Sequence, residues 1–161
     1  FIIIALACIL ILLFLTYIIA NSIGVDIISG FISSKSTQGN ELDFTLGGKM
    51  VFTNNSLNQL QSLFAQNANK EFKSCLKGLV VNGTYIINQA YVPKTYSQKF
   101  NEVISDSCSD DSLVDLHSHP KNHCLPSQQD FITFKQFKER QPLGLMIVMC
   151  QPNRFAVYDK V

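Results

Sequence analysis

The sequence predicts an α+β fold of the mixed α/β kind, because segments with the patterns of strands and of helices follow one another irregularly. Two segments rich in β-branched and aromatic residues, Cys75–Val81 and Thr84–Tyr91, flank an Asn-Gly dipeptide and predict an antiparallel hairpin. A continuous apolar run, Leu143–Cys150, has the length of a buried strand. Ser127–Arg140 has phenylalanines at helical spacing and predicts a helix that packs on these strands.

The chain divides into an apolar N-terminal segment and one domain. Residues 1–20 form an uninterrupted apolar run with no charge and no proline, which is long enough to cross a bilayer as a helix. We therefore expect a single-pass membrane protein with one N-terminal transmembrane helix. Residues 21–41 mix apolar residues with glycine and serine and predict an amphipathic extension followed by a linker. Residues 42–161 are then the folded domain.

The side of the membrane that the domain faces stays open. Asp26 and Lys35 are the only charges between the apolar run and Glu41, so the distribution of positive charge gives no orientation. Sequons at Asn54 and Asn82 would suit an outward-facing domain.

The cysteines leave the redox state of the chain open. They form an odd set without a CxxC pair, so neither a structural zinc knuckle nor a disulfide framework is required. Cys108 and Cys124 could pair if the domain faces an oxidising space. The positions of the set are Cys8, Cys75, Cys108, Cys124 and Cys150.

Charge excludes one class of partner. The formal net charge is +1, and the sequence has no long basic run. Nucleic-acid binders need a basic surface, often interleaved with aromatic residues. We therefore expect no nucleic-acid partner.

Other elements of the domain follow from local patterns. Lys49–Thr53 is a strand candidate, and Ser56 then begins a helix in which Gln59 completes a capping box. A polar loop, Ser107–Ser112, precedes a strand at Leu113–His117.

Metal-binding residue types gather where that strand ends. His117 and His119 project from the same face, because successive side chains of a strand point to opposite faces. Ser127 follows a proline and predicts a helix N-cap, which places Asp130 in the first turn. Two histidines and one carboxylate, without a fourth protein ligand, are typical of a catalytic zinc site with an open position. We therefore expect Zn²⁺ bound by His117, His119 and Asp130.

These residues resemble the signature of the JAMM (MPN-plus) zinc metalloproteases, which is His-x-His-Pro, six residues and Ser-x-x-Asp, with a glutamate upstream. The sequence reads HSHP, KNHCLP and SQQD without a gap. Glu71–Gly78 is similar to the family's Glu-x-x-Gly-x-Leu-x-Gly segment, although Ser74 replaces the first glycine. His123 and Cys124 match no position of the motif. The resemblance implies the JAMM/MPN fold, a curved β-sheet flanked by helices.

The resemblance also implies roles and a substrate. Glu71 would be the general base that takes a proton from the attacking water and passes it to the leaving amine. Ser127 would donate a hydrogen bond to the developing oxyanion. The protein would then be a membrane-anchored zinc metallo-isopeptidase of the deubiquitinase-like kind. Its substrates would be conjugates of ubiquitin-like proteins, which favours a cytoplasmic domain.

Two interpretations compete with the enzyme. A non-catalytic MPN relative could serve as a scaffold, but such a protein should have lost one or more ligands. A chain that begins in a long apolar helix is also similar to a processed pilin subunit, although the pilin-like glutamate near the start is absent. A subunit of that kind would form a homo-oligomer or a filament through the N-terminal helix.

Overall fold

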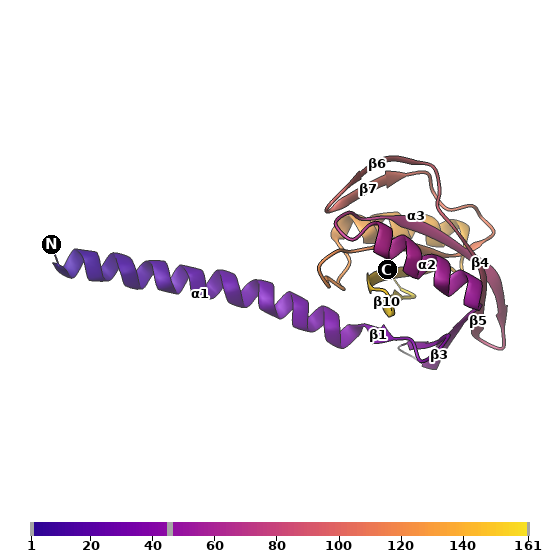
Figure 1. The fold of residues 1–161 in the computed structure, drawn as a ribbon, viewed down its shortest axis with the longest axis horizontal. Coiled ribbons are helices and arrows are strands. Elements are labelled where there is room, and N and C mark those ends of the chain that lie inside the picture. The colour runs from indigo at the N-terminus through magenta and orange to yellow at the C-terminus, as the bar shows by residue number, and fades with distance from the viewer. Residues whose placement is uncertain (1, 45–46, 161) are drawn as a thin grey trace.

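The computed structural model describes residues 2–44 and 47–160, apart from the side chains of residues 2–3 and 19–24. It shows a long N-terminal helix and a mixed α+β domain, which confirms the predicted fold class (Figure 1). In chain order, the elements are α1 (Ile2–Ser33), β1 (Lys35–Ser36), β2 (Glu41–Phe44), β3 (Gly48–Phe52), α2 (Asn54–Gln66), β4 (Lys73–Val81), β5 (Thr84–Tyr91), β6 (Thr95–Lys99), β7 (Glu102–Ser105), β8 (Ser112–Ser118), α3 (Gln128–Arg140), β9 (Leu145–Gln151) and β10 (Arg154–Tyr158).

The main sheet is curved and nearly closed. Within the described residues it has eight strands, in the order β1-β10-β9-β8-β4-β5-β3-β2. Most neighbours are antiparallel, whereas β3 with β5 and β8 with β9 are parallel. β1 and β2 stand at opposite ends of this order, yet Gln38, which follows β1, and Glu41, which begins β2, exchange backbone hydrogen bonds of 2.8 and 3.1 Å. The sheet therefore curls until its two edges meet.

The two faces of the sheet carry different cores. α2 covers one face, where Leu57 and Leu60 belong to the larger core cluster. α3 covers the other face, where Phe134 and Phe137 pack with Met146 of β9. Side chains of a strand alternate between faces. Asp115 of β8 pairs with Met146 in the register, so the odd-numbered residues around it face α3.

The predicted hairpin is confirmed, and its turn explains why. β4 and β5 pair antiparallel up to Val81 and Thr84. Asn82 and Gly83 between them have φ values of +48° and +79°. Positive φ at both central residues is the geometry that an Asn-Gly turn favours.

The predicted start of α2 is wrong. Its N-cap is Thr53, which has an extended backbone and whose side-chain oxygen accepts a hydrogen bond from the Ser56 backbone N–H. The buried Ser56 hydroxyl instead donates to the Ile87 carbonyl of β5 at 3.0 Å. Ser56 is therefore used to join the helix to the sheet, a long-range contact that a local capping pattern does not contain.

The single-pass membrane assignment is also wrong. None of the helices in residues 2–44 and 47–160 meets the combined requirement of length and apolarity for crossing a bilayer. Residue 1 of the predicted transmembrane helix lies outside the described residues.

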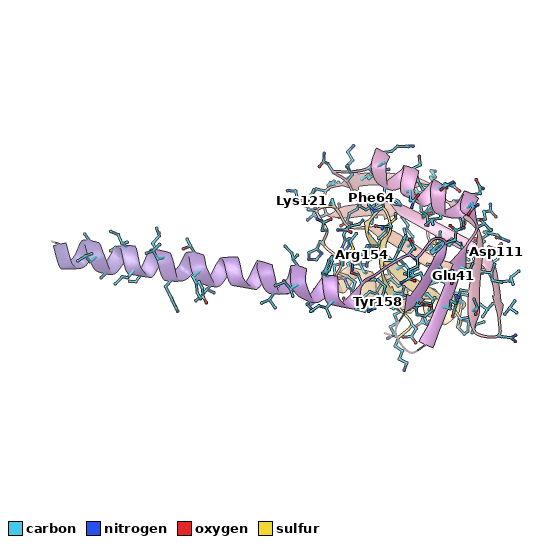
Figure 2. The ribbon with its side chains drawn as sticks, turned by 60° about the horizontal axis from the view of Figure 1, so that its bottom comes forward. Glu41, Phe64, Asp111, Lys121, Arg154 and Tyr158 are labelled. Carbon is cyan, nitrogen blue, oxygen red and sulfur yellow. A yellow bond between two sulfur atoms is a disulfide. The ribbon has the colours of Figure 1, made fainter. Side chains whose placement is uncertain are left out.

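The residues predicted as extension and linker are built into helix and sheet. α1 continues to Ser33, and β1 then pairs with β10 through Lys35 and Phe155. The Arg154 guanidinium donates to the carbonyls of Phe31 and Ser34, at 3.1 and 3.2 Å, and covers the Phe31 ring. Figure 2 labels Arg154 near the point where the helix meets the domain. These contacts set the direction in which α1 leaves the domain.

Two disulfides cross-link the domain. Cys75 of β4 bonds Cys108, and Cys124 bonds Cys150 of β9. The pairing of Cys108 with Cys124 is therefore wrong, because the fold brings each of them within 5.5 and 5.1 Å, between Cα atoms, of a strand cysteine instead. The bond from Cys124 to β9 anchors the loop between β8 and α3.

We predict that Cys124→Ala together with Cys150→Ala lowers the free energy of unfolding by about 3 kcal/mol, because the bond closes a loop with a sequence separation of 26. Denaturant unfolding of the oxidised protein measures this. Cys8→Ala is the matched control, since Cys8 is an exposed free cysteine. Equal unfolding midpoints for the double variant and the parent would contradict the structural role of the bond.

Candidate metal centre

The register of β4 and β8 brings the upstream glutamate to the histidines. Lys73 of β4 pairs with His117 of β8. The ladder continues beyond the strand end, because Ser118 N–H donates to the Phe72 carbonyl at 2.9 Å and Phe72 N–H to the Ser118 hydroxyl at 3.0 Å. Glu71 therefore arrives beside His119, with its Oε1 3.6 Å from His119 Nε2.

The N-terminus of α3 supplies the carboxylate. Ser127 is the N-cap, as predicted, and its side chain accepts the backbone N–H of Asp130 in a capping box. Asp130 Oδ2 in return accepts hydrogen bonds from the Ser127 N–H and hydroxyl, at 2.6 and 2.7 Å. The cap thus sets where the carboxylate points.

Three possible metal ligands converge. His117 Nε2 and His119 Nε2 lie 3.2 and 3.5 Å from Asp130 Oδ2. One ligand atom from each of the three residues lies within 4.8 Å of the others, so this group could hold a metal ion. Both histidines are buried, and His117 Nε2 has no hydrogen-bond partner in the described residues despite its short distance to Asp130. A buried nitrogen that has no hydrogen-bond partner and lies near two other possible ligand atoms is typical of a metal ligand without its ion.

Glu71 stands next to this group and has the electrostatics of a base. Burial raises the pKa of its carboxyl to about 7, against the charge of His119 and with the help of the negative charges of Asp130 and Glu102. A base with a pKa near neutrality can both take and return a proton.

Asp130 has the opposite electrostatics. Burial raises the pKa of its carboxyl, but the adjacent imidazoles of His117 and His119 and the hydrogen bond from Ser127 outweigh burial and hold the pKa well below its usual range. Asp130 is therefore an ionised carboxylate, as a metal ligand must be.

His117, His119, Asp130 and Glu71 line part of the wall of a cavity of about 700 Å³. Ser127 lines it, but its hydroxyl is directed at Asp130. Phe100 and Glu102 reach the cavity from the hairpin of β6 and β7, which stands apart from the main sheet (Figure 1). Asp26 of α1 reaches it from another side.

Several groups at the centre were not expected from the sequence. The loop residue His123 has its Nδ1 3.4 Å from the Nδ1 of His119. Lys73 and Asp115 form a buried ion pair in the same cavity. Lys73 follows Glu71 by two residues, and Asp115 precedes His117 by two. Because side chains alternate along a strand, these spacings could have predicted that both residues face the site.

Comparison with known proteins adds no family assignment. No family model matches the chain, and no curated protein is significantly similar to it. The resemblance to the JAMM signature therefore rests on the motif residues, and the site on their geometry.

The raised pKa of Glu71 predicts a pH-dependent cost to the metal-free fold. The folded carboxyl keeps its proton up to a pH of about 7, whereas the ordinary value is 4.5. Folding stability from this group is therefore present below pH 4.5 and is lost as the pH rises towards and past 7. Glu71→Gln lacks this loss, so its free energy of unfolding should gain roughly 3 kcal/mol on the parent between pH 4 and pH 8. Denaturant unfolding with a chelator present measures the difference, and a constant difference across this range would contradict the burial of the carboxyl.

Proposed function

We propose that the protein is a zinc-dependent hydrolase of peptide or isopeptide bonds of the JAMM type. The observation that supports this most directly is that His117, His119 and Asp130 lie close enough to share an ion, with Glu71 beside them. Those four residues occupy the positions that the JAMM signature assigns to three ligands and a base.

The donor set suits zinc. Two imidazole nitrogens and one carboxylate oxygen leave an open coordination position, as in catalytic zinc sites. Calcium and magnesium take oxygen ligands almost exclusively, so the two histidines disfavour them. When bound, zinc supplies Lewis acidity towards a water and towards the carbonyl oxygen of the substrate.

The residues of the chain divide the remaining work. Glu71 takes the proton of the attacking water and returns it to the leaving amine, for which a pKa of about 7 is well matched. Ser127 holds Asp130 in place through the capping box. The Cys124–Cys150 bond anchors the loop that connects the histidines to that cap. The two histidines are buried at the wall of the cavity, which limits the access of bulk water to the reaction.

The substrate proposed here is an amide bond to an amine, and a ubiquitin-like protein conjugate is the class that the JAMM resemblance implies. Disulfides persist in oxidising compartments. The two in this domain therefore favour a conjugate or peptide that the enzyme meets in such a space.

A second candidate function is assembly through α1. Its large apolar side chains between residues 4 and 18 are exposed and stand out from the helix away from the domain (Figure 2). Further copies of the chain could cover them and build an oligomer or filament. Sedimentation of the full chain, compared with Leu6→Lys and Leu13→Lys, tests this, because charges on the helix should disperse the assembly.

We predict that Glu71→Gln keeps about one zinc per chain but lowers turnover by about 10²- to 10⁴-fold, which is the usual contribution of a general base. His117→Ala and Asp130→Ala should lose the metal as well, because each removes a ligand. Metal analysis of the purified protein and cleavage of a panel of ubiquitin-like fusions measure the two effects.

Glu139→Gln is the matched control, because Glu139 of α3 is exposed and lies outside both the cavity and the ligand group. It should keep both zinc and turnover. Near-full activity of Glu71→Gln would assign the base to another carboxylate. Zinc in the parent without cleavage of any fusion or peptide would favour the scaffold interpretation.

A further inference from the structure

Beside the metal centre, the cavity contains charged groups that hydrolysis does not use. Lys73 Nζ donates to Asp115 Oδ2 at 2.8 Å, and the two side chains are only 9% and 7% exposed. Both residues line the cavity that contains His117 and Glu71. A buried ion pair gives little net stability compared with apolar residues of similar size. Stability alone therefore does not explain the pair.

The strand register places the pair next to the metal ligands. Lys73 lies opposite His117, and Asp115 precedes His117 by two residues on the same face of β8. Two strand residues span about 7 Å, which is also the reach of two residues of an extended substrate. A substrate whose scissile bond lies at the centre can therefore place a group on the pair.

The pair has unused hydrogen-bonding capacity. An ammonium has three donors and a carboxylate has two acceptor oxygens. Among the described residues, Lys73 Nζ bonds only Asp115, and the second oxygen of Asp115, Oδ1, has no hydrogen bond. Phe134 and Met146, both almost fully buried, line the same cavity and lower the local dielectric. Hydrogen bonds made in such surroundings are strong and selective.

We propose that Lys73 and Asp115 form a substrate subsite that binds a neutral amide. The carbonyl oxygen of the amide accepts from Lys73 Nζ, and its N–H donates to Asp115 Oδ1, while the ion pair stays intact. A carboxylate would be attracted by Lys73 but repelled by Asp115, and an ammonium the reverse, so neither gains a net attraction to offset its loss of hydration. An apolar group would leave the spare donors unpaired. The subsite serves the hydrolase proposed above, on which its role as a substrate site rests.

The test uses the zinc-loaded full chain with Glu71→Gln, which is not expected to cut the probes. The probes are the peptides Ac-Gly-Xaa-Gly-NH₂ with Gln, Glu, Lys or Leu as Xaa, and NMR titration gives their dissociation constants. We expect the Gln peptide to bind roughly tenfold more tightly than the others, since a hydrogen bond to a charged group is worth about that factor. If the four peptides bind the parent equally and all bind the pair variant more weakly, the group bound at the subsite is a backbone amide of the peptide and not the Gln side chain.

The pair variant is Lys73→Met with Asp115→Leu, changed together so that neither charge is left buried alone. It should lose the preference and keep its zinc. The matched control is Lys77→Met with Asp111→Leu, which removes an ion pair of 2.7 Å at the middle of β4, outside the cavity. This control should keep the preference.

Tightest binding of the Glu, Lys or Leu peptide would overturn the proposal, and this order of affinities is measured even if the pair variant does not fold. Affinities that are the same in the pair variant and its parent would also overturn it. A parent chain that prefers the Gln peptide but hydrolyses no peptide would refute the hydrolase and leave the subsite in place.

Discussion

The backbone hydrogen bonds between β4 and β8 set Lys73 opposite His117, and the position of every group in the cavity follows from this register. Glu71 and His119 lie two residues beyond this pair in one direction, and Asp115 lies two residues from His117 in the other. A shift by one residue would turn all of these side chains to the opposite face of the sheet. The proposed proton carrier, the two candidate histidine ligands and the proposed subsite therefore depend on one strand pairing.

The position of the third candidate ligand depends on a different feature, the N-terminal cap of a helix. Asp130 belongs to α3, and the capping box with Ser127 determines its direction before any metal binds. The loop that joins β8 to α3 is anchored to β9 by the disulfide between Cys124 and Cys150. Helix capping and one covalent bond thus hold the carboxylate against the strand that carries the histidines. Such preorganisation reduces the entropy lost when a metal binds.

Burial affects the pKa values of the two carboxyl groups of the cavity differently. Burial raises the pKa of Glu71 to about 7, whereas at Asp130 the adjacent histidines and the hydrogen bond from Ser127 outweigh burial and lower the pKa. One carboxylate thereby has the pKa that suits the proposed base, and the other stays ionised as the proposed metal ligand must, a division that environments of different polarity produce. Lys73 and Asp115 form an ion pair, which offsets part of the free-energy cost of burying the two charges.

The sequence by itself determined the local features: the hairpin turn at Asn82 and Gly83, the helix cap at Ser127, and the two histidines on one face of a strand. Each depends on residues a few positions apart, so the pattern contains the cause. Only the tertiary structure decided which cysteines pair, that Ser56 bonds the sheet and does not cap α2, and that Lys73 meets Asp115. These contacts join residues far apart in the chain, and their energies depend on burial and distance that no local pattern records.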